Sequence, residues 1–161
     1  MKKTPETIVV LDSIRSTFNV GSIFRTSDAL NVSKIILCGT TPTPTDRFGR
    51  DREDIAKVAL GAERNVDWEY FPKVLWVVKQ LKKEGYKIVM IEQSEKSVDY
   101  KKVKFGKKDK IVFVIGTEVE GISKSLLKLA DQIAEIPMLG SKESLNVSVA
   151  FGVAMFRMLN I

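Results

Sequence analysis

Short apolar runs alternate along the chain with longer segments in which apolar residues recur at helical spacing. Four of the runs are rich in β-branched residues and predict buried strands: Thr7 to Leu11, Lys34 to Cys38, Lys87 to Ile91 and Ile111 to Ile115. Two weaker runs predict extended pieces at Val66 to Phe71 and Ile133 to Met138. Strands that alternate with helices predict one α/β domain over residues 1–161, a mainly parallel sheet with helices on both faces.

The connecting helices are expected at Asn19 to Asn31, Ile55 to Ala62, Lys73 to Glu84 and Ser123 to Ala130. Asn19 and Ser123 are the expected caps, because short polar side chains accept hydrogen bonds from the first-turn amides. Arg25 falls outside the apolar stripe of its helix and so points toward solvent or a site.

The last helix is apolar on two sides. One face is formed by Val147, Ala150, Phe151, Ala154, Met155 and Met158, and the opposite side by Val149, Val153, Phe156 and Leu159. The sheet can cover one side, and a second copy of the chain is the simplest cover for the other, so we expect a homodimer. Ser144 and Asn146 precede this helix. They either cap it or help a ligand bind at its N-terminus, and the local pattern alone favours capping.

Composition narrows the possible chemistry. The chain has 161 residues, 26 Lys and Arg against 20 Asp and Glu, and a net charge of +6, which favours a polyanionic partner. It has no histidine, which excludes histidine bases and most zinc sites, so no metal is expected. The single cysteine, Cys38, is interpreted as a small buried hydrophobe. No run is long enough to cross a membrane and no signal-peptide pattern is seen, so we expect a cytoplasmic protein without a membrane partner.

Two basic stretches are candidate RNA contacts. The loop 39–54 has two prolines, two glycines and three arginines, which predicts a mobile surface segment. This loop could hold RNA phosphate through Arg47, Arg50 and Arg52 and stack on a base through Phe48. An ordinary solvated loop with one anchoring Phe explains the pattern equally well. The stretch 101–110 carries six lysines, among them Lys101, Lys102 and Lys104, and is either a solvated edge or a phosphate-binding surface.

Three polar loops follow predicted strands, at residues 12–21, 116–121 and 138–146. Ligands of parallel sheets bind beyond the carboxyl ends of the strands, so these loops predict one pocket. Its polar members are expected to be Asn19, Arg25, Glu118, Ser144 and Asn146. The sequence GTEVEG in the middle loop permits a tight turn but does not match the G-x-G-x-x-G fingerprint of dinucleotide-binding proteins.

The segments FNVGSIFRTSDAL, VIGTEVEGIS and IPMLGSKESLNVSVAFGVAMF resemble, in order and spacing, the three motifs of the SpoU family of RNA ribose methyltransferases, within the SPOUT class. The resemblance spans nearly the whole chain, and its last motif is the most specific. It implies S-adenosylmethionine as methyl donor, the ribose 2′-hydroxyl of tRNA or rRNA as acceptor, a homodimer, and a C-terminal trefoil knot of the SPOUT fold. It implies a SpoU-type catalytic domain, and the short chain suggests no separate RNA-binding domain.

The resemblance also implies roles for individual residues. Cofactor contacts are expected from Ile91, Gly116, Gly121, Ile136, Met138, Ser144 and Leu145. The catalytic set is expected to be Asn19, Arg25, Glu118, Ser144 and Asn146, with Arg25 proposed in the family to activate the ribose hydroxyl. Because arginine scarcely loses its proton at neutral pH, we hypothesise that Arg25 binds the adjacent phosphate and stabilises developing negative charge. The alternative function is a catalytically silent RNA-binding module on the same fold.

Overall fold

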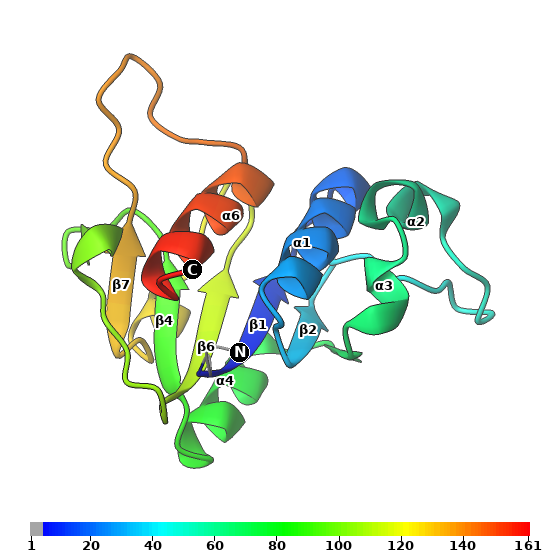
Figure 1. Ribbon diagram of the computed structural model, residues 1–161, viewed down its shortest axis with the longest axis horizontal. Coiled ribbons are helices and arrows are strands. Elements are labelled where there is room, and N and C mark those ends of the chain that lie inside the picture. The colour runs from blue at the N-terminus through cyan, green and yellow to red at the C-terminus, as the bar shows by residue number, and fades with distance from the viewer. Residues whose placement is uncertain (1–4) are drawn as a thin grey trace.

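The computed structural model describes residues 5–161 and centres on one seven-stranded sheet (Figure 1). The strand order is β3-β2-β1-β6-β4-β7-β5, and every neighbouring pair is parallel. The strands are β1 (Glu6–Asp12), β2 (Lys34–Cys38), β3 (Trp68–Phe71), β4 (Lys87–Ile91), β5 (Val98–Asp99), β6 (Lys110–Ile115) and β7 (Gln132–Glu135). The predicted parallel α/β sheet is confirmed.

Two strands differ from the prediction. The two-residue strand β5 was not expected, because it has no apolar run of its own and forms only by pairing with β7. The strand β7 ends at Glu135 instead of Met138. Pro137 lacks the N–H group that a paired strand needs, which explains the early end.

Helices cover both faces of the sheet, as predicted. They are α1 (Thr17–Ala29), α2 (Glu53–Ala59), α3 (Ala62–Asn65), α4 (Val74–Lys83), the 3-10 turn η1 (Tyr100–Lys102), α5 (Lys124–Leu127) and α6 (Val147–Met158). On one face Phe24 of α1 and Phe151 of α6 pack with Phe113 of β6. On the other, Val78 of α4 and Leu126 of α5 pack with the strands. Figure 1 shows α1 and α6 side by side over the first face.

Helix ends differ from the prediction in three places. The cap of α1 is Ser16, whose hydroxyl accepts a hydrogen bond from the Asn19 N–H at 3.2 Å, so Asn19 lies inside the first turn. The helix expected over residues 55–62 is broken into α2 and α3, because Leu60 and Gly61 both have positive φ values, 53° and 93°. Ser123 is confirmed as the cap of α5, which is shorter than predicted and ends at Leu127.

Cys38 ends β2 and is fully buried. Burial, together with the nearby Asp12 carboxyl, raises the pKa of its thiol to about 12. The thiol is therefore protonated at physiological pH, and the interpretation of Cys38 as a core residue is confirmed. How the chain is threaded between β7 and α6 does not follow from strand order, so the trefoil knot stays a prediction.

Candidate active site

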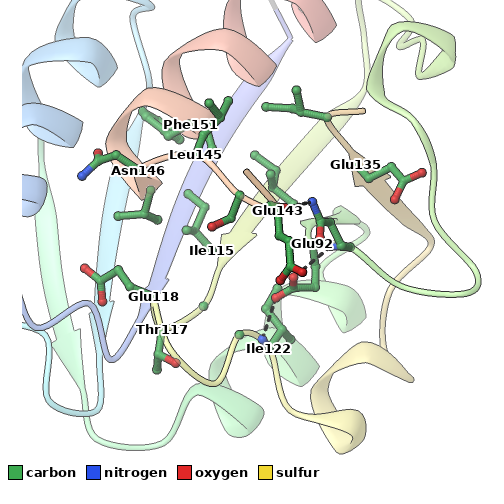
Figure 2. Close-up of a pocket in the computed structure, with 18 of the residues that line it drawn as sticks. Glu92, Ile115, Thr117, Glu118, Ile122, Glu135, Glu143, Leu145, Asn146 and Phe151 are labelled. Carbon is green, nitrogen blue, oxygen red and sulfur yellow. Dashed lines mark hydrogen bonds between the residues drawn. The ribbon is translucent and has the colours of Figure 1, made fainter. Parts of the chain in front are cut away.

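A cavity of about 690 Å³ lies at the carboxyl ends of β4, β6 and β7, against the start of α6 (Figure 2). The loop 116–122 after β6 and the segment 136–147 before α6 form most of its wall. All seven residues expected to contact the cofactor line it: Ile91, Gly116, Gly121, Ile136, Met138, Ser144 and Leu145. The structure therefore brings the predicted cofactor residues together at one place.

Two glycines let the loop after β6 fold tightly. A Cβ atom on Gly116 would lie 2.7 Å from the carbonyl carbon of Gly121, which no side chain tolerates. Gly121 has a φ of +66°, and a Cβ atom there would collide with the carboxylate of Glu92. The Gly121 N–H closes the turn by donating to the Thr117 carbonyl at 3.0 Å. The backbone itself thus forms this wall of the cavity.

A chain of hydrogen bonds joins three of the predicted catalytic residues. The Asn19 amide Nδ2 donates to Glu118 Oε1 at 2.9 Å, and Asn146 Nδ2 donates to Asn19 Oδ1 at 3.2 Å. Asn19 is only 5% exposed and does not itself line the cavity, whereas Glu118 and Asn146 do. Asn19 therefore acts as the buried link that holds two cavity residues in fixed orientation.

Asn146 also caps α6. Its Oδ1 accepts hydrogen bonds from the Ser148 and Val149 N–H groups at 2.9 and 3.4 Å. The same side chain donates to Asn19 through its Nδ2. The two alternatives weighed for Asn146, helix cap and site residue, are thus both compatible with its geometry, because the two functions use different atoms of one amide.

Glu92 and Gln93, which follow β4, were not predicted. Glu92 Oε2 accepts a hydrogen bond from the Ile122 N–H at 2.9 Å, drawn in Figure 2, and Gln93 Nε2 donates to the Glu143 carbonyl at 2.7 Å. These two side chains tie both cavity loops to the end of β4. They were missed because only three strand-end loops were considered, although the segment after β4 is a fourth loop at the same edge of the sheet.

Arg25 does not line the cavity, contrary to the expectation of one pocket within the chain. Its side chain is exposed on the outer side of α1, in one helical stripe with Phe18 and Ser22. Ser144 does line the cavity but makes no hydrogen bond among residues 5–161. One chain therefore assembles Asn19, Glu118 and Asn146 and leaves Arg25 apart.

The outer sides of α1 and α6 form an exposed apolar face. Phe18 is 59% exposed, and on α6 Val149, Val153 and Phe156 are 50%, 41% and 40% exposed. The sequence placed these three α6 residues on the uncovered side, and the structure agrees; Leu159, placed there too, is buried at 8% exposure at the end of the helix. Arg25 lies beside this face.

The cavity is strongly acidic although the chain is basic. Its ionisable lining residues are all glutamates: Glu92, Glu118, Glu120, Glu135 and Glu143. Among the described residues no group of three or more His, Cys, Asp or Glu side chains could hold a metal ion. An acidic, partly apolar cavity suits an organic ligand that carries positive charge.

Residues 6–156 match the sequence model of the SpoU rRNA Methylase family. The chain belongs to this family. A 23S rRNA (guanosine-2′-O-)-methyltransferase, RlmB, from Ralstonia nicotianae is 32% identical over 152 residues, 94% of this chain and 57% of that protein. The tRNA (guanosine(18)-2′-O)-methyltransferase of Aquifex aeolicus is 30% identical over 158 residues, 96% of this chain and 69% of the relative.

Solved structures agree with this membership. The AdoMet-bound rRNA methyltransferase from Sinorhizobium meliloti is 30% identical and superposes with a TM-score of 0.81, over 94% of this chain and 55% of that structure. The Aquifex aeolicus TrmH/SpoU tRNA modifying enzyme is 27% identical and superposes with a TM-score of 0.81, over 97% of this chain and 75% of that structure. The chain spans a little over half the length of several of the proteins it matches.

The SpoU fold of these neighbours is thus the fold of this chain, as the sequence motifs predicted. Residues from the second and third motifs form most of the cavity wall, and Ile91, Glu92 and Gln93 add to it from the end of β4. Asn19 of the first motif is hydrogen-bonded to this wall. Within residues 5–161 no helix has both the length and the apolar character that crossing a bilayer requires.

Proposed function

We propose that this chain transfers a methyl group from S-adenosylmethionine to a ribose 2′-hydroxyl of tRNA or rRNA. The observation that carries the proposal is the acidic cavity of about 690 Å³, in which the expected cofactor residues meet at the carboxyl edge of a SpoU fold. Two relatives with about 30% identity are named as 2′-O-methyltransferases of rRNA and tRNA, which supports the same reaction type.

The residues present fit S-adenosylmethionine. The volume is in the range of cofactor pockets, the tight turn between Gly116 and Gly121 presents backbone to the cavity, and Ile136 and Leu145 offer apolar surface. When bound, the cofactor supplies a methyl group on a positively charged sulfonium. Carboxylates such as Glu92 and Glu143 favour that charge by Coulomb attraction.

On the acceptor side, the hydrogen-bonded set of Asn19, Glu118 and Asn146 holds polar atoms rigidly at the cavity rim. Such fixed groups orient a bound hydroxyl and lower the barrier without reorganising during the reaction. Arg25 contributes a planar fork of donors, suited to the phosphate beside the target ribose and to the negative charge that develops on its oxygen.

We propose that Arg25 works in a homodimer, on the cavity of the other chain. The apolar face of Phe18, Val149, Val153 and Phe156 gives a reason for pairing, and Arg25 lies beside it and away from its own cavity. A dimer on this face would cover the apolar side chains and bring Arg25 to a second cavity. We also propose that the C-terminal segment is threaded through a loop to make the trefoil knot expected of the family.

RNA is proposed to bind the basic loops that hold Arg47, Arg50 and Arg52 and Lys101, Lys102 and Lys104, all at least partly exposed. We propose that residues 1–161 act as a SpoU-type catalytic domain, in the cytoplasm where tRNA and rRNA are found. The alternative is the catalytically silent RNA-binding module, which needs the basic loops but not the cofactor cavity.

The test combines cofactor binding with methyl mapping. We expect calorimetry to show binding of S-adenosylmethionine, and total tRNA and rRNA incubated with protein and cofactor to gain 2′-O-methyl groups at specific positions. Arg25→Ala should lower turnover at least about a hundredfold with cofactor binding unchanged, and Arg25→Lys should recover little, because lysine keeps the charge but not the fork. No heat at millimolar cofactor would favour the silent module. Near-normal turnover of Arg25→Lys would show that the planar donor fork of arginine is not needed.

A further inference from the structure

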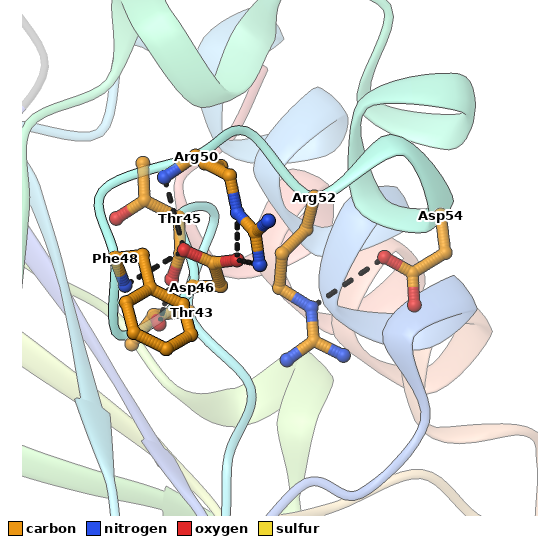
Figure 3. Close-up of polar contacts among 7 residues, drawn as sticks. All are labelled: Thr43, Thr45, Asp46, Phe48, Arg50, Arg52 and Asp54. Atoms are coloured by element: carbon orange, nitrogen blue, oxygen red, sulfur yellow. Dashed lines mark hydrogen bonds and ion pairs between the residues drawn. The ribbon is translucent and has the colours of Figure 1, made fainter.

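The segment 43–52, between β2 and α2, is a closed hairpin held by its own polar groups (Figure 3). Thr45 and Asp51 form an antiparallel bridge, and the Arg52 N–H donates to the Pro44 carbonyl at 2.8 Å. The Asp46 N–H donates to the Arg50 carbonyl, also at 2.8 Å. The loop predicted here is confirmed as a surface segment, and the structure adds that its shape is defined by internal hydrogen bonds.

Asp46 is the centre of this hairpin. Its carboxylate accepts hydrogen bonds from the N–H groups of Phe48 and Arg50 at 2.8 and 3.0 Å, and from Arg50 Nε at 2.8 Å. The hydrogen bond from the Arg50 backbone is the main cause that holds the pKa of Asp46 below its ordinary value. The carboxylate is therefore ionised at neutral pH and fixes the turn that carries Phe48.

Phe48, at the tip, is 67% exposed. The Arg47 guanidinium carbon lies 4.7 Å from the ring centroid and that of Arg50 lies 5.1 Å from it. A solvated loop with an anchoring Phe was one alternative from the sequence, and this exposure argues against it. The ring therefore lies on the surface, flanked by two cations and not packed against the core.

The three arginines of the hairpin differ in what they already bind. Arg50 pairs with Asp46 at 2.8 Å, and Arg52 lies 3.5 Å from Asp54. Arg47 makes no ion pair with any residue that the structure describes. Arg50 thus serves to build the hairpin, and Arg47 is the cation that remains available for a phosphate.

We propose that Phe48 stacks on an unpaired RNA base and that Arg47 contacts the phosphate next to it. This inference rests on the proposed function, with RNA as substrate. It adds that the base in contact with Phe48 must be unpaired, because a base stacked inside a duplex offers neither face to a side chain. Asp46 is a positioning residue, since it holds the turn and touches no ligand. The hairpin then favours RNA that is unpaired or looped where it meets Phe48.

The experiment measures dissociation constants by fluorescence anisotropy, with a labelled unpaired twelve-nucleotide RNA and with a duplex of the same sequence. We expect Phe48→Leu to weaken binding of the unpaired RNA about tenfold and of the duplex less than about twofold, and Phe48→Trp to restore it. Arg47→Gln should lower the slope of log affinity against log salt by about 0.7, the value expected when one phosphate of single-stranded RNA is no longer neutralised.

Trp76→Leu is the matched control, because Trp76 is an exposed aromatic residue, at 53%, on α4 instead of the hairpin. It should change neither RNA affinity. Calorimetry with S-adenosylmethionine shows that each variant keeps its cofactor site. Wild-type protein that binds cofactor but no RNA would overturn the proposed function itself. RNA binding that Phe48→Leu leaves intact, or weakens equally for duplex and unpaired RNA, would overturn this inference alone, as would capture of a protein partner by Phe48 without any RNA effect.

Discussion

The two long loops at the carboxyl edge of the sheet are held in opposite ways. The hairpin 43–52 makes most of its hydrogen bonds within itself, around Asp46. The described hydrogen bonds of segment 136–146 all go elsewhere, to Gln93, to Asn19 and to the first turn of α6. Leu139, near its tip, is 98% exposed. A loop that satisfies its own polar groups keeps its shape alone, whereas one that depends on distant partners holds its shape only when the whole site is assembled.

The largest effect should come from breaking the link between segment 136–146 and α1. Asn19→Leu leaves Asn146 and Glu118 without their buried partner, and we expect methyl transfer to fall about a hundredfold. Stability should fall by about 1 to 3 kcal/mol, measured by urea unfolding. Lys79→Gln, an exposed residue of α4 on the other face of the sheet, is the control. An unchanged rate in Asn19→Leu would remove the network from catalysis.

The next effect concerns Glu92. Glu92→Ala removes the acceptor for the Ile122 N–H and should raise the dissociation constant of S-adenosylmethionine about tenfold by calorimetry. Glu135→Ala is the control, because Glu135 lines the same cavity but its side chain makes no hydrogen bond among the described residues. It should change affinity less than about threefold. Equal weakening in both variants would mean that charge matters and the bond to the loop does not.

Breaking the hairpin should leave the cofactor cavity untouched. Asp46→Ala removes the bonds to Phe48 and Arg50, and we expect RNA affinity to fall about fivefold with cofactor affinity unchanged. Because the folded-state pKa of Asp46 lies below its ordinary value, its contribution is present at neutral pH and disappears as pH falls through that lowered pKa. RNA affinity of the wild type should therefore show no step from Asp46 between about pH 5 and 8. A cofactor affinity that falls with RNA affinity would contradict the independence of the two loops.

The smallest effect is expected at the lysine stretch. Replacing Lys101 and Lys104 by Gln should lower the salt slope of RNA binding by about 0.7 for each phosphate that these lysines neutralise in the wild type. The comparison is with Lys73→Gln, at the start of α4 and on neither basic loop. A slope that does not change would place residues 101–104 outside the RNA surface.

The pattern of the chain predicted the sheet well, because β-branched runs such as Ile111 to Ile115 form strands wherever both faces are covered. It did not predict β5, which exists only through pairing with β7, or the break at Leu60, a residue that rarely adopts positive φ. Such features depend on tertiary packing.

The residues that line the cavity were predicted better than the contacts among them, because those contacts also depend on tertiary packing. Motif residues such as Gly116 and Leu145 were correctly expected at one cavity, because strand ends converge in a parallel sheet. Arg25 was correctly expected to point away from the apolar stripe of its helix. Helical spacing gives only the direction of a side chain, however, and does not say which group it will meet. Glu92 was missed because the segment after β4 was not among the three predicted pocket loops. Its hydrogen bond to Ile122, 30 positions away along the chain, is also not visible in the sequence.

The buried, protonated thiol of Cys38 has a practical consequence. It is the single cysteine of the chain and is fully buried, so thiol-reactive dyes and spin labels should not react with the native protein. A cysteine introduced at Leu139 would then be the only labelled position, as would one at Phe48 in a separate variant. Spectroscopic probes can therefore follow each loop individually without first removing a natural label site.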